Sequence, residues 1–186
     1  MRKVIVIGGG VSGLQAGVFT AKAGEDTLVL DTDESLVFNT SNIQNLIGHE
    51  SVSGQELIRS GRNKLEEFDG ELKEEKVEKV ERTDDGFRIE TENGEHESEY
   101  IIVASAGELD FLDPLELEFE DGVEGPYMME EHIRTDDSNK AGEGIYAAGL
   151  ANSWEYQTST AIGDGAKAAL NLISEINGEP YTDHDT

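Results

Sequence analysis

Three glycines near the start of the chain have the spacing of a phosphate-binding turn. Gly8, Gly10 and Gly13 form the pattern G-x-G-x-x-G. In such a turn the first glycine permits a tight bend, the second lets the backbone approach a pyrophosphate, and the third lets a helix pack closely on a strand. The amides that begin the helix then face the phosphates. The residues expected to hold a dinucleotide pyrophosphate are Gly8, Gly9, Gly10, Val11, Ser12 and Gly13.

The elements around this turn form a β-α-β unit. Residues 3–7 are expected to form a short strand whose positions 4–7 are an unbroken apolar run typical of a buried strand, and residues 12–23 carry small and apolar positions at helical spacing. A second strand at 27–30 ends at Asp31, 23 residues after Gly8. A carboxylate there accepts a hydrogen bond from a ribose hydroxyl and repels the 2′-phosphate of NADP. Asp31, with the adjacent Thr32, is therefore expected to bind the ribose, although a strand-end cap is the alternative role.

The segments after Asp31 complete an α/β pattern. Residues 32–52 have no clear period and are expected to be a loop over the ligand, and Ser53 and Glu56 form a capping box that starts a helix ending near Gly70. Residues 75–103 alternate like strands and contain an Asn93-Gly94 turn, which predicts a small antiparallel meander whose last strand rejoins the main sheet.

The last third of the chain combines an irregular segment with a strand and a helix. Residues 107–144 are acidic and contain Pro114 and Pro126, so they are expected to be irregular. Residues 144–149 predict a buried strand and 158–176 a helix with Ile162, Ala166, Ala169, Ile173 and Ile176 on one face. We expect one Rossmann-like domain over residues 1–186, with three layers, a mainly parallel sheet and a small antiparallel β-meander.

The charge of the chain is strongly negative. It has 41 Asp and Glu against 14 Lys and Arg, a formal net charge of −27, yet it keeps regularly spaced aliphatic runs. This predicts a folded core under an acidic surface that is adapted to concentrated salt, as in halophilic proteins, because salt screens the mutual repulsion. We therefore expect stability to rise with added salt. The charge argues against binding nucleic acid or an anionic membrane and favours neutral, basic or small partners.

Several kinds of chemistry are excluded or disfavoured by composition. The chain has no cysteine, which excludes disulfides, thiolate nucleophiles and cysteine-based metal sites. The four histidines are scattered and are expected on the surface or in loops rather than at a metal: His49, His96, His132 and His184. No apolar run is long enough to cross a membrane and none reads as a signal peptide, so a cytoplasmic location is expected.

The chain resembles the FAD domain of the thioredoxin reductase-like flavoproteins over residues 1–106 and about 125–178. The resemblance is carried by Gln44-Asn45-Leu46-Ile47-Gly48, by the strands at 101–106 and 144–149, and by Tyr156-Gln157-Thr158 before a small-residue helix. It implies that Asn45 packs by the flavin, that the backbone of Lys76 and Val77 holds the adenine, and that Gln157 and Thr158 face the flavin N1/O2 edge. It also implies cofactor contacts at the ends of the two strands, from Ala104, Ser105, Gly149 and Leu150.

Three departures from that family bear on function. The family inserts a pyridine-nucleotide domain where this chain has only the 38 residues 107–144, and a second nucleotide domain needs roughly 100. The family's redox cysteine pair is missing. The family's Gly-Asp after the closing strand reads Gly149-Leu150, which removes a carboxylate that binds the ribityl and phosphate region of FAD.

These features favour an FAD-dependent oxidoreductase domain whose electrons come from a separate reductant. No catalytic side chain stands out, so the cofactor would supply the chemistry. A non-catalytic module that binds FAD or NAD remains open, as does a binder of NAD alone. The family resemblance further implies a homodimer.

Overall fold

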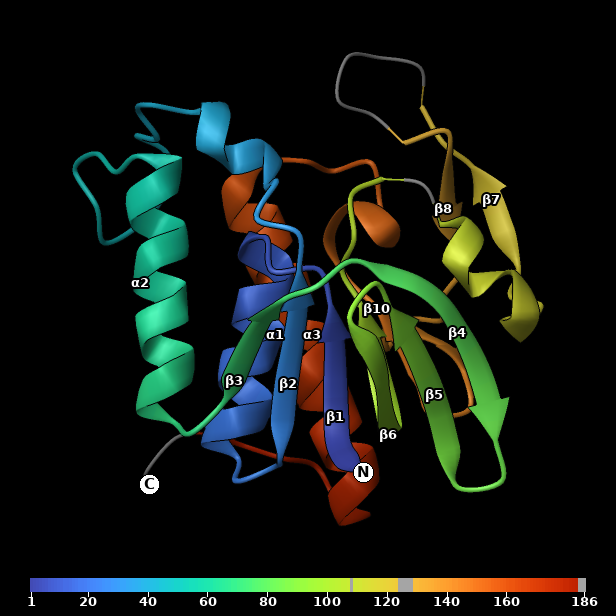
Figure 1. The fold of residues 1–186 in the computed structure, drawn as a ribbon. Helices are drawn as coiled ribbons and strands as arrows, with labels where there is room; N and C mark the ends of the chain where they lie inside the picture. The colour runs from blue at the N-terminus through green and yellow to red at the C-terminus, as the bar shows by residue number, and fades with distance from the viewer. Residues whose placement is uncertain (108, 124–128, 184–186) are drawn as a thin grey trace.

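A computed structural model describes residues 1–107, 109–123 and 129–183 of the chain (Figure 1). Its helices are α1 (Val11–Lys22), α2 (Gly54–Glu67) and α3 (Thr158–Asn177), with short 3-10 turns η1 (Leu36–Asn39), η2 (Asp110–Leu115) and η3 (Gly149–Ala151). Its strands are β1 (Arg2–Ile7), β2 (Thr27–Asp31), β3 (Glu71–Glu74), β4 (Val77–Thr83), β5 (Gly86–Thr91), β6 (Gly94–Val103), β7 (Phe119–Asp121), β8 (Glu131–Ile133), β9 (Lys140–Gly142) and β10 (Ile145–Ala147).

The main sheet is parallel and has the strand order β3-β2-β1-β6-β10-β9, with only β9 antiparallel to its neighbour. Strand β6 is long: its first half pairs antiparallel with β5, and its second half lies parallel to β1, with Val6 opposite Ile102. Strand β4 pairs with β5 in turn. The predicted meander and its return to the main sheet are therefore confirmed, and so is the α/β fold class.

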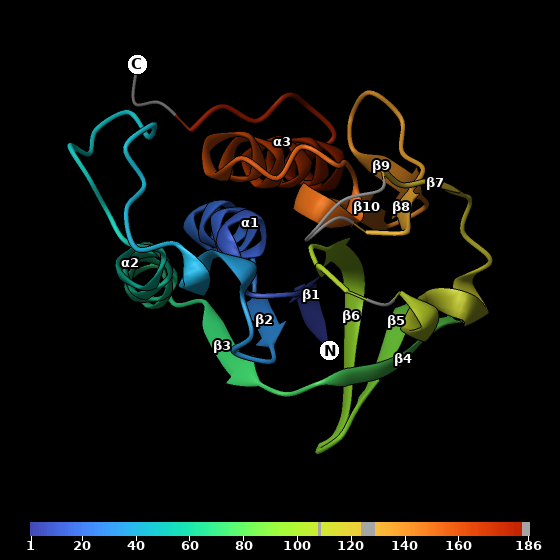
Figure 2. The same cartoon turned by 90° about the horizontal axis from the view of Figure 1, so that it is seen from above.

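The layers are visible in Figure 2, where α1 and α3 lie on one face of the parallel sheet and the β4–β5 hairpin lies on the other. Alternation along β1 divides the core between these layers. Val4 and Val6 belong to the cluster on the helical side, whereas Ile5 and Ile7 belong to the cluster on the meander side. All four are almost fully buried, as expected for a central strand covered on both faces.

The capping box of α2 is formed as predicted. The Ser53 hydroxyl accepts a hydrogen bond from the Glu56 amide at 3.2 Å, and the Glu56 carboxylate accepts one from the Ser53 amide at 3.0 Å. Helix α3 ends at Asn177 and is capped by Gly178, whose φ of +72° suits a glycine cap.

The apolar face predicted for α3 is only partly the face that the fold buries. Ala169 and Ile173 are buried, whereas Ile162, Ala166 and Ile176 are only half-buried. The remaining buried positions are Ala161, Gly165, Ala168 and Leu172. A Cβ on Gly165 would lie 2.1 Å from the Ser12 carbonyl oxygen, so α3 turns its small residues toward α1 because the two helices approach closely.

Three segments contain more structure than the sequence patterns indicate. Strand β3 pairs with β2 at the sheet edge, and its sequence Glu-Leu-Lys-Glu gives no apolar run. Residues 107–144 are not irregular throughout, because they hold η2, the antiparallel β7–β8 pair and β9; Pro126 lies outside the described residues. The expected loop 32–52 contains η1 and an isolated bridge between Ile43 and Val52.

Candidate functional site

The carboxyl ends of the parallel strands meet at one edge of the sheet and border a cavity of about 620 Å³. Strand β1 leads into Gly8, β2 ends at Asp31, and β6 leads into Ala104. This edge is where ligands bind in open α/β sheets, and the volume lies within the range of about 300–1,000 Å³ usual for ligand pockets. The loop at 34–40, the start of β4 and the start of α3 close its sides.

The first and third glycines of the pattern are packed so closely that side chains would not fit there. Gly8 has φ of +105°, and a Cβ there would lie 2.6 Å from the Ala104 carbonyl oxygen. A Cβ on Gly13 would lie 1.8 Å from the Gly8 carbonyl oxygen. The first and third glycines of the pattern therefore serve the tight bend and the helix packing that their spacing predicts.

The start of α1 is arranged to receive an anion. Its N-cap, Gly10, offers no side-chain cap to the first amides, and its first turn holds no acidic residue. Val11 and Ser12 of that turn line the cavity, so the positive end of the helix dipole faces it. Free amides at a helix start bind phosphate well.

Asp31 is held at the end of β2 by two donors. Its Oδ1 accepts a hydrogen bond from the Gly9 amide at 2.9 Å, and its Oδ2 lies 3.0 Å from Nη2 of Arg62 on α2. The residue is only 7% exposed but lines the cavity. Gly9 is required here too, because a Cβ would lie 2.6 Å from Cγ of Asp31. A strand-end carboxylate thus stands beside the glycine turn, as the spacing predicts.

A second carboxylate lies where β4 begins. Glu75 lines the cavity together with Lys76 and Val77, and its Oε2 lies 2.8 Å from both Thr91 Oγ1 and His96 Nε2. Burial opposes ionisation of this carboxyl, but the hydrogen bonds from His96 and Thr91 outweigh it and hold the Glu75 pKa below its ordinary value. This end of the cavity therefore keeps a negative charge near neutral pH.

The turn after β10 is fixed by buried polar contacts. The Gly149 amide donates to Oδ2 of Asp164 on α3 at 2.7 Å, and Asp164 also accepts from Asn139 at 2.6 Å. Nδ1 of His132 lies 2.7 Å from the Leu150 carbonyl oxygen and must be the donor. The expectation of a surface position for His132 is wrong: it is 4% exposed because β8 packs against this turn. Leu150 itself lines the cavity.

The other histidines differ in their surroundings. His49 is exposed in a loop, as expected, whereas His96 lies on β6 and is only partly exposed; His184 lies outside the described residues. Among the residues that the structure describes, no cluster of three or more His, Cys, Asp or Glu side chains is suited to a metal ion.

Most of the predicted cofactor residues line this one cavity: Gly8, Gly9, Gly10, Val11, Ser12, Asp31, Thr32, Lys76, Val77, Ala104, Ser105, Leu150 and Thr158. Gly13 and Gly149 instead support the adjacent turns. Asn45 and Gln157 do not line it either, but they meet each other, with Asn45 Nδ2 donating to Gln157 Oε1 at 3.2 Å across 112 residues of sequence. Arg62, Glu75 and Asp164 take part in the site although no local pattern singles them out.

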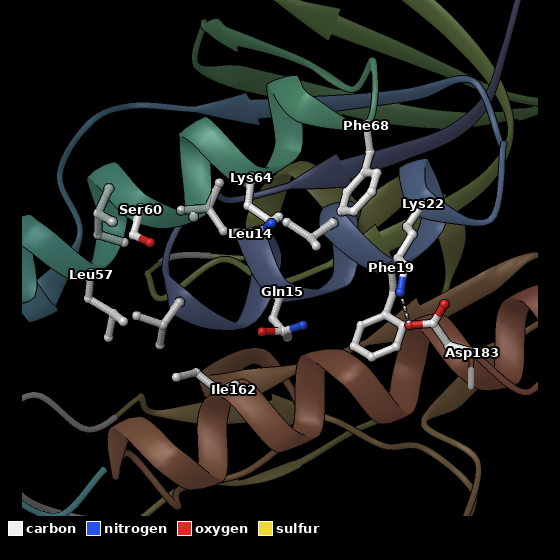
Figure 3. Close-up of a pocket in the computed structure, with 14 residues that line it drawn as sticks. Leu14, Gln15, Phe19, Lys22, Leu57, Ser60, Lys64, Phe68, Ile162 and Asp183 are labelled. Carbon is white, nitrogen blue, oxygen red and sulfur yellow. Dashed lines mark hydrogen bonds and ion pairs between the residues drawn. The ribbon is translucent and has the colours of Figure 1, made fainter. Parts of the chain in front are cut away.

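A second cavity, of about 410 Å³, lies between α1, α2 and α3. Figure 3 shows Leu57 of α2 and Ile162 of α3 on its two sides, with Leu14 and Phe19 of α1 between them. At one end, Lys22 and Lys64 lie over the Phe68 ring, and Lys22 pairs with Asp183 at 2.8 Å. This cavity is mainly apolar and borders the first cavity at Val11, which lines both.

The sequence matches known flavoproteins. A family model described as an FAD binding domain matches residues 3–56. The thioredoxin reductase of Rickettsia bellii (strain RML369-C) is 30% identical over 122 residues, which cover 63% of this chain and 39% of that protein. The thioredoxin reductase of Aquifex aeolicus (strain VF5) is 36% identical over 107 residues, covering 55% and 33%. The chain thus spans about two fifths or less of the length of these relatives.

Solved structures share the fold over nearly the whole chain. The atypical thioredoxin reductase TRi from Desulfovibrio vulgaris Hildenborough aligns with a TM-score of 0.77 at 22% identity, covering 97% of this chain and 100% of that one. An oxidoreductase from Agrobacterium tumefaciens aligns with a TM-score of 0.82 at 15% identity, covering 95% and 99%. Within the described residues, no helix has the length and apolar character needed to span a membrane.

Proposed function

Sequence and fold relate the chain to the thioredoxin reductase-like FAD-binding flavoproteins, and from this premise we propose that it binds FAD in the cavity at the carboxyl edge of the sheet. The observation that carries the proposal is the junction of Gly8–Gly13, the uncapped start of α1 and Asp31 around that cavity. In this proposal the domain is an oxidoreductase whose electrons come from a separate donor.

The residues around the cavity suit the parts of FAD. Amides at the start of α1 would hold the pyrophosphate, and Asp31 would accept a hydrogen bond from a hydroxyl of the adenosine ribose. The Lys76–Val77 backbone would border the adenine. FAD supplies the redox chemistry when it is bound. The first turn of α3 contains no acidic residue, and its Thr158 lines the cavity. That helix start would stabilise negative charge on the ring by about 0.3–2 kcal/mol.

The separate donor is part of the proposal because of the connection between β6 and β10. Its described part consists of short elements, η2, β7, β8 and β9, and the whole segment 107–144 is far shorter than a nucleotide domain. The donor would be another protein or a diffusible nicotinamide.

A non-catalytic role is the second candidate, and Leu150 favours it. The position lines the cavity with an apolar side chain where the resemblance implies a carboxylate. Losing one charged hydrogen bond costs about 1.5–3 kcal/mol, which weakens binding roughly ten- to hundred-fold. The domain would then hold FAD or NAD as a structural or sensing ligand.

The first prediction concerns the bound cofactor. We expect the purified protein to be yellow, with an absorbance band at about 450 nm from a flavin that is released on denaturation. Calorimetric titration of the protein freed of flavin should show tighter binding of FAD than of NAD. Colourless protein that takes up no FAD would contradict the proposal. Bound flavin that neither nicotinamides nor reduced ferredoxin can reduce would favour the non-catalytic module.

We also propose that the chain forms a homodimer through the apolar cavity between α1, α2 and α3 (Figure 3). Apolar side chains from all three helices gather there on a protein whose net charge is −27. A second copy would cover them and gain hydrophobic stabilisation, most of all in concentrated salt that screens the mutual charge.

The dimer proposal predicts the effect of a charge in this cavity. Light scattering should give twice the monomer mass of 20.3 kDa for the native chain and the monomer mass for Leu57→Glu. Gln55→Glu adds the same charge at an exposed position of α2 outside the cavity, so it should leave the dimer intact. A native mass near 20.3 kDa in molar salt would show that the surface does not pair copies of the chain.

A further inference from the structure

Arg62 of α2 joins two carboxylates beside the cavity. Its Nη2 lies 3.0 Å from Oδ2 of Asp31 and 2.6 Å from Oδ1 of Asp33. The Asp31 side chain is 8% exposed and that of Asp33 is 46% exposed, so the contact to Asp31 is the less solvated of the two. Arg62 is not among the residues that line the cavity, whereas Asp31 is. Any effect of Arg62 on a ligand in the cavity therefore passes through Asp31.

The two donors on Asp31 fix how its carboxylate faces the cavity. The Gly9 amide holds Oδ1 and Arg62 holds Oδ2, so the carboxylate cannot rotate about its last bond without losing one of them. Each oxygen of an ionised carboxylate accepts more than one hydrogen bond, so both keep capacity for a ligand hydroxyl. Arg62 thus orients the Asp31 carboxylate and leaves it able to accept a further hydrogen bond from a ligand.

The position of Arg62 carries a cost. Its Nε is buried and has no hydrogen-bond partner among the described residues. A buried donor without a partner is unfavourable, and such groups in folded proteins call for an explanation. The contact between Arg62 and the buried carboxylate of Asp31 supplies one, because an unpaired charge in that position would cost more.

We propose that Arg62 is a positioning residue that aligns Asp31 with the 2′-hydroxyl of an adenosine ribose and so sets the preference of the site for a ribonucleotide. The inference rests on the proposed binding of an adenine dinucleotide. Since Arg62 is already shared between Asp31 and Asp33, its charge is largely balanced. A 2′-phosphate would therefore meet the Asp31 carboxylate rather than a free guanidinium.

The test compares two ligands that differ by one hydroxyl, ADP and 2′-deoxyADP, on the full chain. We expect Arg62→Gln to raise the dissociation constant of ADP about ten-fold and that of 2′-deoxyADP less than about two-fold. The reason is that only ADP has the hydroxyl that Asp31 would hold. Arg62→Lys keeps the charge and should recover much of the ADP affinity. A loss of packing alone would weaken both ligands equally, so the hydroxyl dependence separates positioning from structure.

A matched control removes the same charge from the same helix. Arg59 is an exposed residue of α2, and Arg59→Gln should leave both dissociation constants unchanged. If Arg62→Gln fails to fold, Arg62→Lys still tests the coupling between Arg62 and Asp31, because it should show a smaller loss of affinity that affects ADP and not 2′-deoxyADP.

Different results would separate the two proposals. Native protein that binds neither FAD nor ADP would overturn the proposed function. The other case is a native protein that binds both FAD and ADP. If the Arg62 variants then lost affinity for ADP and 2′-deoxyADP equally, or lost affinity for neither, this inference would be overturned and the proposed function would stand.

Discussion

Gly13→Ala is expected to destabilise the protein by about 3 kcal/mol and to abolish tight FAD binding. The new Cβ would lie 1.8 Å from the Gly8 carbonyl oxygen and 3.2 Å from Cβ of Ala104. Neither Gly8 nor the start of α1 can move away without opening the glycine turn, and forcing extra atoms into a packed core costs about 1–3 kcal/mol or more. For a chain of this size the melting temperature should fall by roughly 6–12 °C.

The same shift would spoil the proposed pyrophosphate site. Moving the first amides of α1 by even part of an ångström lengthens several hydrogen bonds at once, so we expect FAD affinity to fall about hundred-fold or more. Thermal melts and FAD titration measure the two effects separately.

Gly163→Ala is the matched control for Gly13→Ala. Gly163 lies within α3, is exposed, and a Cβ there would meet nothing within 4 Å. Alanine in a helix is more favourable than glycine by up to about 1 kcal/mol, so this variant should melt slightly higher and bind FAD normally. If both alanine variants behaved alike, the close packing at Gly13 would not be what the turn requires.

The parts of the fold that the sequence predicts are those whose signals lie close together along the chain. The unit from β1 to Asp31 depends on glycine spacing and apolar runs within its first 31 residues. The capping box of α2 lies within the four residues 53–56 and forms as predicted. The hairpin that Asn93-Gly94 predicts also forms, but its turn is displaced by one residue: Thr91 pairs with Gly94, so the turn residues are Glu92 and Asn93 and Gly94 begins β6.

The missed site residues lie on elements that meet only after folding. Arg62 is 31 residues from Asp31, His96 is 21 from Glu75, and Asp164 is 15 from Gly149. No spacing rule links a charged residue on one helix face to a strand end two elements earlier. These contacts depend on how α2, β6 and α3 pack, which periodicity alone does not determine.

The buried face of α3 shows a related limit. A search for large apolar residues selects Ile162 and Ile176, but close contact with α1 requires small ones such as Gly165 and Ala168. A helix that carries both kinds of residue has two candidate faces. The partner helix decides between them, because only the small face lets the start of α1 come near.

Leu150→Asp is expected to bind FAD about ten- to hundred-fold more tightly than the native chain, by adding a charged hydrogen bond worth about 1.5–3 kcal/mol. Leu150 lines the cavity, and its backbone is held from both sides by contacts that the substitution does not touch. The Gly149 amide donates to Asp164 at 2.7 Å, and the Leu150 carbonyl accepts from His132 at 2.7 Å. A new carboxylate would thus be presented where the resemblance implies that one contacts the ribityl chain.

The gain should come with a loss of stability in the absence of cofactor. Leu150 is half-buried and packs against the core cluster on the meander side of the sheet. Removing those apolar contacts and placing a charge there should cost about 1–3 kcal/mol, so the ligand-free variant should melt lower and recover when FAD is added. Titration of FAD and melts with and without it measure both effects.

Leu150→Asn decides whether charge or shape produces the gain. It removes the same apolar contacts and offers an acceptor of the same size without the negative charge, so it should lose similar stability but gain less affinity for FAD. A carboxylate aimed at the pyrophosphate instead of the ribityl hydroxyls would repel it, and Leu150→Asp would then bind FAD more weakly than Leu150→Asn. Repulsion of that kind would fade in molar salt, whereas a direct hydrogen bond to a hydroxyl would persist. The order of the two variants in low and high salt therefore distinguishes a site that lost one acceptor from a site built for a different ligand.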